Sequence, residues 1–413
     1  MLRFEASALM LPTMTTQSPD PYVPPVPTAF SIFLLAVASL ASALAFRIGD
    51  PLLPQLSVEF NTSTGNVAHV VTAFAVAYGI AQFFYGPLGD RLGKYRTITL
   101  ATLFCSVGSL GAAFAPSLEV LLFCRALSGI AGAGVMPLAL AWIGDGVPYE
   151  RRQATMARFL IGSITGIAGG QVVGGLFADT LGWRSGFVFL AILYLTAGIA
   201  LHVFRPAPDR RPARDAQAHI FSSLVELFKV KWARLVILFG FIEGAIVFGI
   251  LAFVPNYLQS RFGVSATIAG ATGALFAIGG YGYVVLASWL VPRLGERGMV
   301  LSGGGILALA FLMLLAGPVW TWALPSGLLC GFGYYLVHST LQVQATQMAP
   351  KVRGTSVAMF ASFLFTGQAF GAWAVAQISE TVGINWAFAL AMVLMPTVAT
   401  GFAMALKRRK FAG

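Results

Sequence analysis

The sequence has few charged residues for its length. Only 10% of its 413 residues are Asp, Glu, Lys or Arg, whereas about 25% are charged in an ordinary soluble domain. A soluble fold of this size could not cover its surface with so few charges. Low hydrophobicity is typical of disordered chains, but here 57% of the residues are hydrophobic. The composition therefore favours a membrane protein with several spans.

Cysteine and histidine are also scarce, with 3 and 4 residues. Cys105, Cys124 and Cys330 lie inside apolar runs, without CxxC spacing or a nearby His, so neither a disulfide framework nor a metal site is indicated. The chain contains no G-x-x-x-x-G-K-[ST] motif, no HExxH motif and no constellation of paired carboxylates or of Ser and His. We expect no cofactor, no metal and no enzymatic activity.

Long apolar runs are abundant. A transmembrane helix needs about 20 residues, and the chain has twelve runs of suitable length. They fall at 29–57, 67–88, 97–115, 118–142, 155–177, 185–204, 233–257, 267–291, 299–317, 320–342, 356–378 and 385–406. Helices are expected because lipid offers no partner to free backbone groups. The sequence predicts an all-α membrane protein with twelve transmembrane helices.

Lys and Arg are distributed unevenly between the two sides of this predicted bundle. If both termini are cytoplasmic, 22 of the 26 basic residues lie on the cytoplasmic side and 2 on the outer side, while Arg47 and Arg125 lie within spans. Cytoplasmic loops are enriched in these residues, so we expect both termini to be cytoplasmic. The net charge of +11 then reflects topology, and we expect no nucleic-acid partner.

The two halves of the chain resemble each other at a shift of 202 residues. Arg91-Leu92-Gly93 corresponds to Arg293-Leu294-Gly295, and Ser63 corresponds to Ser265. A six-helix unit begins and ends on one side of the membrane, so the copies are parallel and enclose a cavity near the midplane. The predicted parts are a disordered cytoplasmic tail at 1–28, six-helix bundles at 29–204 and 232–406, a cytoplasmic linker at 205–231, and a basic cytoplasmic tail at 407–413.

The loop between spans two and three carries the strongest motif. It reads Gly86-Pro-Leu-Gly89-Asp90-Arg91-Leu-Gly93-Lys94-Tyr-Arg96 and resembles the loop signature of the major facilitator superfamily. The span number and the half-repeat extend the resemblance over essentially the whole chain. It implies two pseudo-symmetric bundles and a gate loop in which Asp90 and Arg91 form a latch. The loop residues concerned are Gly86, Gly89, Asp90, Arg91, Gly93 and Arg96.

Span five has a glycine every four residues, from Gly162 to Gly174, which favours close packing of this face on another helix. The segment resembles an antiporter signature of the same family, but Gln171 replaces the proline of that signature. The helix-packing residues are Gly166, Gly170, Gln171, Gly174 and Gly175. The departure at Gln171 removes the expected helix bend and weakens the prediction of export.

Two carboxylates within the predicted spans are candidates for proton coupling. Asp50 lies three residues after Arg47, on the same helix face, and Pro51 and Pro54 predict a break in the helix there. Glu243 has no basic residue within one helical turn, and burial disfavours the charged form of such a group. The alternatives are that Arg47 and Asp50 only neutralise each other, and that Glu243 stays protonated in a structural hydrogen bond.

Arg125, His338 and Gln342 complete the candidate site with Arg47. A charge at mid-membrane is costly, so Arg125 needs a partner or water; its alternative role is a structural ion pair. His338 and Gln342 are four residues apart and share a helix face, although a packing role is also open for His338. In the family that the chain resembles, spans one, four, seven and ten line the cavity, and each bears a polar or ionisable residue, Glu243 being that of span seven.

The resemblance implies a secondary transporter that works by alternating access and is most similar to the 12-span drug:proton antiporters. We expect proton-coupled efflux of a small organic solute across a bacterial-type inner membrane, by a monomer whose partners are the solute, protons and lipid. Proton-coupled uptake of a nutrient or metabolite is the alternative. A non-transporting sensor and a passive channel are further alternatives from other classes.

Overall fold

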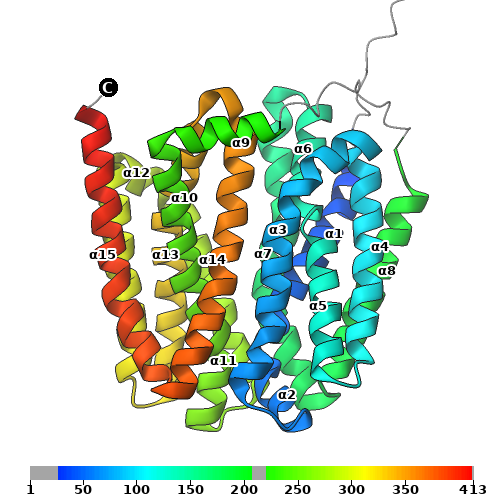
Figure 1. The fold of residues 1–413 in the computed structure, drawn as a ribbon, viewed down its shortest axis with the longest axis vertical. Helices are drawn as coiled ribbons and strands as arrows, with labels where there is room; N and C mark the ends of the chain where they lie inside the picture. The colour runs from blue at the N-terminus through cyan, green and yellow to red at the C-terminus, as the bar shows by residue number, and fades with distance from the viewer. Residues whose placement is uncertain (1–26, 207–219, 412–413) are drawn as a thin grey trace, which may run out of the picture.

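The computed structural model describes residues 27–206 and 220–411. Residues 1–26, most of the predicted tail, and residues 207–219 of the predicted linker lie outside this range. The described chain forms two bundles of helices that lie side by side (Figure 1). The fold predicted from the sequence is confirmed.

The first bundle, the N-half, contains α1 (Ala29–Arg47), η1 (Asp50–Leu52), α2 (Leu53–Glu59), α3 (Thr64–Leu92), α4 (Lys94–Ala113), α5 (Leu118–Gly132), α6 (Val135–Gly146), α7 (Tyr149–Thr180) and α8 (Trp183–Val203). A surface helix, α9 (Ile220–Lys229), precedes the second bundle. This bundle, the C-half, contains α10 (Lys231–Glu243), η3 (Gly244–Phe248), α11 (Gly249–Phe262), α12 (Ala266–Ala316), η4 (Trp320–Trp322), α13 (Ala323–Gln347), η5 (Pro350–Val352), α14 (Arg353–Thr381) and α15 (Ile384–Phe411).

Ten helical segments of the described chain are long and apolar enough to cross a membrane. One of them, α12, contains two helices that meet at Gly295, where φ is 60° and ψ is 175°. The 25-residue α13 is not among these ten but is long enough to span, so the described helices are consistent with the predicted twelve. Exposed large apolar side chains such as Phe84, Phe123 and Val285 cover the outside of the bundles, as expected for a surface that faces lipid.

The internal repeat appears as matching caps and turns. Gly93 links α3 to α4 with φ at 90°, and its counterpart Gly295 makes the same kind of turn within α12. Ser63 and Ser265 are the N-caps of α3 and α12, and both accept a hydrogen bond from the third backbone N–H of the helix. A left-handed turn favours glycine, which explains why the motif repeats at these positions.

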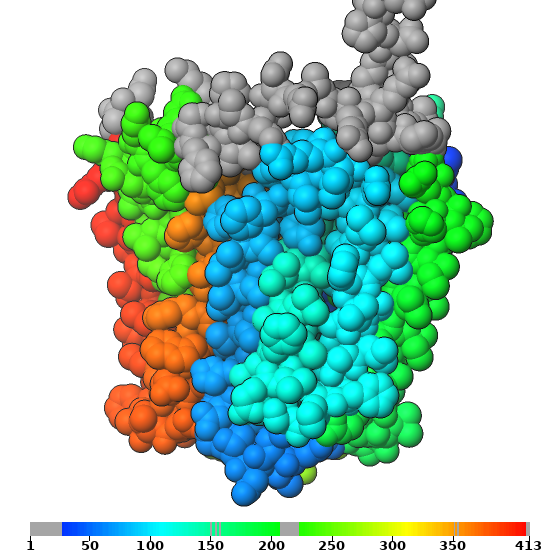
Figure 2. Space-filling model, turned by 45° about the vertical axis from the view of Figure 1, so that its right-hand side comes forward, coloured from blue at the N-terminus to red at the C-terminus, as the bar shows by residue number. Residues whose placement is uncertain are grey.

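The halves meet along two pairs of helices related by the repeat. Helix α3 of the N-half lies against α14 of the C-half, and α7 of the N-half lies against the first part of α12 of the C-half. The contact between α3 and α14 is visible on the surface as the boundary between the two halves (Figure 2). We call the end of the molecule with α2 the α2 end and the opposite one the α9 end (Figure 1).

The glycine stripe of α7 packs directly on α1. A Cβ at Gly166 would lie 2.4 Å from the carbonyl oxygen of Leu40, and one at Gly174 would lie 2.3 Å from that of Ile48. Gly170 meets α1 in the same way. Since real Cβ atoms do not approach backbone oxygen so closely, only glycine permits this helix spacing.

Candidate functional site

Three spans of the described chain are interrupted along their length. The first span stops at Arg47 and continues through η1 into α2, as predicted from Pro51 and Pro54. The fourth is interrupted between Gly132 and Val135. The seventh contains the π-helical turn η3 directly after Glu243. Such turns and broken helices are frequent at functional sites of transporters.

A buried polar network lies at the first break. Asp50 is fully buried, and its Oδ2 accepts hydrogen bonds from Gln171 Nε2 at 2.6 Å and from the Arg47 guanidinium at 3.4 Å. The other Arg47 nitrogen donates to Gln368 Oε1 on α14 at 3.4 Å. The network therefore joins α1 and α7 of the N-half to the C-half. We refer to Arg47, Asp50, Gln171 and Gln368 as the Asp50 network.

Gln171 does more than pack. Besides bonding Asp50, its Nε2 donates to the carbonyl oxygen of Leu251 on α11 at 3.5 Å. A Cβ at Gly273 would lie 1.4 Å from Gln171 Oε1, so the absence of a side chain on α12 makes room for the amide. The residue that departs from the antiporter signature thus holds the carboxylate of the first span.

Glu243 is not isolated, contrary to what the neighbouring sequence suggests. It is 1% exposed, and its Oε2 lies 2.9 Å from Nδ1 of His338 on α13. Its Oε1 has no hydrogen-bond partner among the described residues. The pair contains one carboxyl and one imidazole, and no Lys or Arg forms an ion pair with this carboxyl in the described chain.

Two aromatic rings connect this pair to the Asp50 network. Tyr334 stacks on His338 with ring centroids 4.8 Å apart and contacts Phe248 at 5.0 Å. The guanidinium carbon of Arg47 lies 4.7 Å from the centre of the Phe248 ring, within the range of cation–π attraction. The two candidate proton sites thus belong to one contiguous set of side chains.

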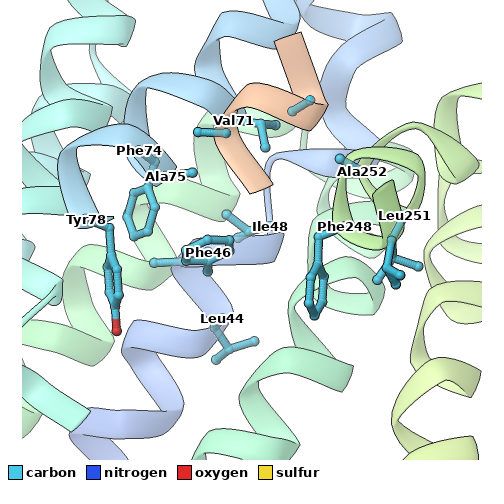
Figure 3. Close-up of a cluster of buried hydrophobic side chains, with 14 of the residues drawn as sticks. Leu44, Phe46, Ile48, Val71, Phe74, Ala75, Tyr78, Phe248, Leu251 and Ala252 are labelled. Atoms are coloured by element: carbon cyan, nitrogen blue, oxygen red, sulfur yellow. The ribbon is translucent and has the colours of Figure 1, made fainter. Parts of the chain in front are cut away.

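Apolar side chains from both halves surround these groups. Phe46 lies between Phe74 and Tyr78 of α3 on one side and Phe248 of the C-half on the other (Figure 3). Its ring also contacts Phe365 of α14, with centroids 5.5 Å apart. Side chains therefore fill the space between the halves at this level.

Arg125 occupies a separate position inside the N-half. It is 1% exposed, its Nε donates to the carbonyl oxygen of Val70 at 3.3 Å, and its guanidinium carbon lies 4.2 Å from the Phe74 ring centre. One terminal nitrogen has no hydrogen-bond partner among the described residues. The alternative of a structural ion pair is not found there, because no described carboxylate pairs with Arg125.

The predicted site is only partly brought together. Gln342 is exposed, one turn beyond His338, whereas the nearby Gln344 is buried and donates to Glu296 at 2.9 Å. Sequence reasoning missed Gln368 and Tyr334. A buried amide inside an apolar run could have indicated Gln368, and the spacing of four residues from His338 could have indicated Tyr334.

The gate loop lies at the α9 end. Gly93 alone joins α3 to α4, and Asp90, Arg91 and Arg96 are exposed on the adjoining helix ends. Lys94 of this loop forms an ion pair with Asp145 at the end of α6.

The loop glycines differ in what they permit. A Cβ at Gly89 would lie 2.5 Å from a Leu138 methyl group, while one at Gly86 would meet nothing within 4 Å. Of these two glycines, only Gly89 is required by packing.

The described residues contain no group of three His, Cys, Asp or Glu side chains placed to hold a metal. A cavity of about 20 Å³ lies within the C-half between α11, α12 and α13. Its walls include Leu251 and Gly273, which also contact Gln171.

Comparison with known proteins defines the class of the molecule. The sequence matches the model of the Major Facilitator Superfamily over residues 35–372. The chain belongs to this family of membrane transporters.

Relatives include Multidrug resistance protein D of Escherichia coli, 29% identical over 48% of this chain and 48% of that protein. A chloramphenicol resistance protein of Pseudomonas aeruginosa is 25% identical over 71% of this chain and 69% of that protein. The first match thus spans about half the length of the relative. The predicted resemblance to the family and to its multidrug resistance members is confirmed.

The fold is shared with a bacterial homolog of the human lysosomal transporter Spinster. Its crystal structure has a TM-score of 0.75 and 18% identity, and the alignment covers 95% of this chain and 98% of that one.

Proposed function

We propose that this protein is a proton-coupled antiporter that exports a small organic solute by alternating access. The observation that carries the proposal is the Glu243–His338 pair, a buried carboxyl and imidazole 2.9 Å apart on two spans of the C-half. The free Oε1 of Glu243 is available to a proton or water when the halves move. Export is supported by the relatives named for drug resistance.

In this proposal the two carboxylates have different tasks. The charge of Asp50 is neutralised by Arg47, and its carboxylate accepts a hydrogen bond from Gln171. Asp50 therefore stabilises the first span where its helix is interrupted. Among the described residues, Glu243 pairs with the imidazole of His338 and with no Lys or Arg, and it exchanges the proton. Arg125, one of whose terminal nitrogens has no hydrogen-bond partner among the described residues, is the anchor for a polar or anionic group of the solute.

The remaining features of the proposal follow from charge distribution and family resemblance. The α9 end is cytoplasmic, because most Lys and Arg flank it, and both termini lie on that side of a bacterial-type inner membrane. Asp90 and Arg91 act as a latch at this end when the halves close there. The protein acts as a monomer, without a nucleic-acid partner.

The test measures proton movement in everted membrane vesicles with an acidified lumen, using a pH-sensitive dye. Chloramphenicol and a panel of amphipathic amines are the probes. We expect a transported compound to release lumenal protons, and Glu243→Gln to abolish this release while the protein remains in the membrane. Glu226→Gln, at an exposed carboxylate of α9, is the matched control and should behave like wild type.

Two results would contradict the proposal. Normal proton release by the Glu243→Gln protein would remove Glu243 from the coupling step. Compound-dependent proton entry into right-side-out vesicles, without release in everted ones, would assign uptake instead of export; this alternative is retained because Gln171 departs from the antiporter signature.

A further inference from the structure

A set of hydrogen bonds joins the two halves on the side of the α2 end. They include those of the Asp50 network and a bond from Gln259 Nε2 to the carbonyl oxygen of Pro51 at 3.1 Å. The others are made by two carboxylates at the outermost turns, Asp179 and Glu380. Neither was singled out by the sequence.

Asp179 lies near the C-terminal end of α7 and binds the start of α12 in the other half. Its carboxylate accepts hydrogen bonds from the backbone N–H of Ala266 at 3.0 Å and of Thr267 at 2.7 Å, and from the Thr267 hydroxyl at 2.6 Å. The first N–H groups of a helix have no partner within the helix, and they carry partial positive charge. Asp179 thus satisfies the N-terminus of a helix from the opposite half.

Glu380 does the same in the reverse direction. It lies near the C-terminal end of α14, and its Oε1 accepts a hydrogen bond from the backbone N–H of Gly65 at 2.9 Å, at the start of α3. A Cβ at Gly65 would lie 2.3 Å from this carboxylate, so glycine is needed for the approach.

The two contacts are related by the internal repeat. Gly65 and Thr267 are 202 residues apart and occupy the same second position after the capping serines Ser63 and Ser265. In each helix the serine satisfies the third N–H, and a carboxylate of the other half satisfies the second. The same kind of contact therefore joins the halves twice, once between α7 and α12 and once between α14 and α3.

We propose that Asp179 and Glu380 are the gate residues of the α2 end, a pair of symmetry-related clamps that hold this end closed and release together when the halves rock apart. The inference rests on the proposed function, since a gate has a role only in a transporter that alternates. The clamps are charge-assisted hydrogen bonds at the surface, three to Asp179 and one to Glu380. They stabilise the closed α2 end and can break in each transport cycle.

The test measures how fast a charged maleimide labels single cysteines at the interface, in protein held in lipid nanodiscs. The reporters are Ala68→Cys and Ala269→Cys, in a background where Cys105, Cys124 and Cys330 are serine. Both alanines are at most 1% exposed and lie one turn inside the clamps, on helices at the interface. The assay needs no substrate and no proton gradient, so it succeeds or fails independently of the proposed coupling.

We expect the double variant Asp179→Asn and Glu380→Gln to raise the labelling rate of both reporters by roughly tenfold or more, because the four hydrogen bonds of the clamps lose the carboxylate charge that strengthens them. Each single variant should give a smaller rise. Gly65→Ala, which displaces Glu380 without removing its charge, should act like Glu380→Gln and provides a second variant if the double one folds poorly.

Glu59→Gln is the matched control. Glu59 is also at the α2 end, but its carboxylate binds Trp183 Nε1 and Arg184 within the N-half, both at 2.5 Å. Its removal should leave the labelling rates unchanged. Unchanged or slower labelling in the double variant, or an equal rise with Glu59→Gln, would overturn the assignment.

Discussion

Gln171 holds the carboxylate of Asp50 from a helix that the sequence marks mainly by its glycines. The 2.6 Å bond forms only because Gly273 leaves room for the amide. We expect Gly273→Ala to displace the Gln171 amide and break its hydrogen bond to Asp50. The free energy of unfolding should fall by about 1.5–3 kcal/mol, the range for a hydrogen bond to a charged group. In a Gln171→Ala background the same change should cost less than about 0.5 kcal/mol, because the clashing atom is gone.

Thermal unfolding in detergent of the four proteins of this cycle measures the coupling. Gly282→Ala is the control on the same helix, since a Cβ there would meet only Phe332 at an ordinary 3.7 Å. Additive effects at Gly273 and Gln171 would show that the amide does not occupy the position described.

At this scale the sequence predicts which charged residues are buried within the spans better than it predicts their contacts. Arg47 and Asp50 are close in sequence, so their pairing could be foreseen. Glu243 and His338 are 95 residues apart, and only the packing of α10 against α13 brings them together. The role of Gln171 depends on Gly273, a distant glycine that no local pattern indicates.

At the scale of elements, the contact between α1 and α7 depends on glycine. A Cβ at Gly166 would lie 2.4 Å from a backbone oxygen, which cannot move without shifting the helix. We expect Gly166→Leu to lower the free energy of unfolding by ~1–3 kcal/mol, the cost of overpacking a well-filled core. Thermal unfolding of the purified protein measures this loss. Gly305→Ala, at an exposed glycine with open space around it, should be neutral or slightly stabilising.

An unchanged melting temperature for Gly166→Leu would show that α1 and α7 are less closely packed than described. The sequence allows this element-level prediction because a four-residue glycine period has one physical reading, close helix contact. The π-helical turn after Glu243 and the break at Gly132 are not predicted, since neither contains proline and both arise from tertiary packing.

At the scale of the whole molecule, the repeat explains most of the architecture. Hydropathy gives the spans, and the 202-residue shift gives two parallel copies, both confirmed by the fold. Which helices form the boundary between the halves follows from tertiary contacts alone. Asp179 and Glu380 bridge the two halves at the α2 end, so the structure has this end closed.

The central claim is that the two halves rock about the buried charged groups, and paired distances test it most directly. Spin labels at exposed Val58 and Val382 report the α2 end, and labels at exposed Leu92 and Arg297 report the α9 end. The distances are measured in nanodiscs over a pH series that spans the titration of carboxyl and imidazole groups, roughly pH 4 to 7. We predict that the α2-end distance lengthens as the α9-end distance shortens, and two distances that stay fixed or change in the same direction would contradict the account.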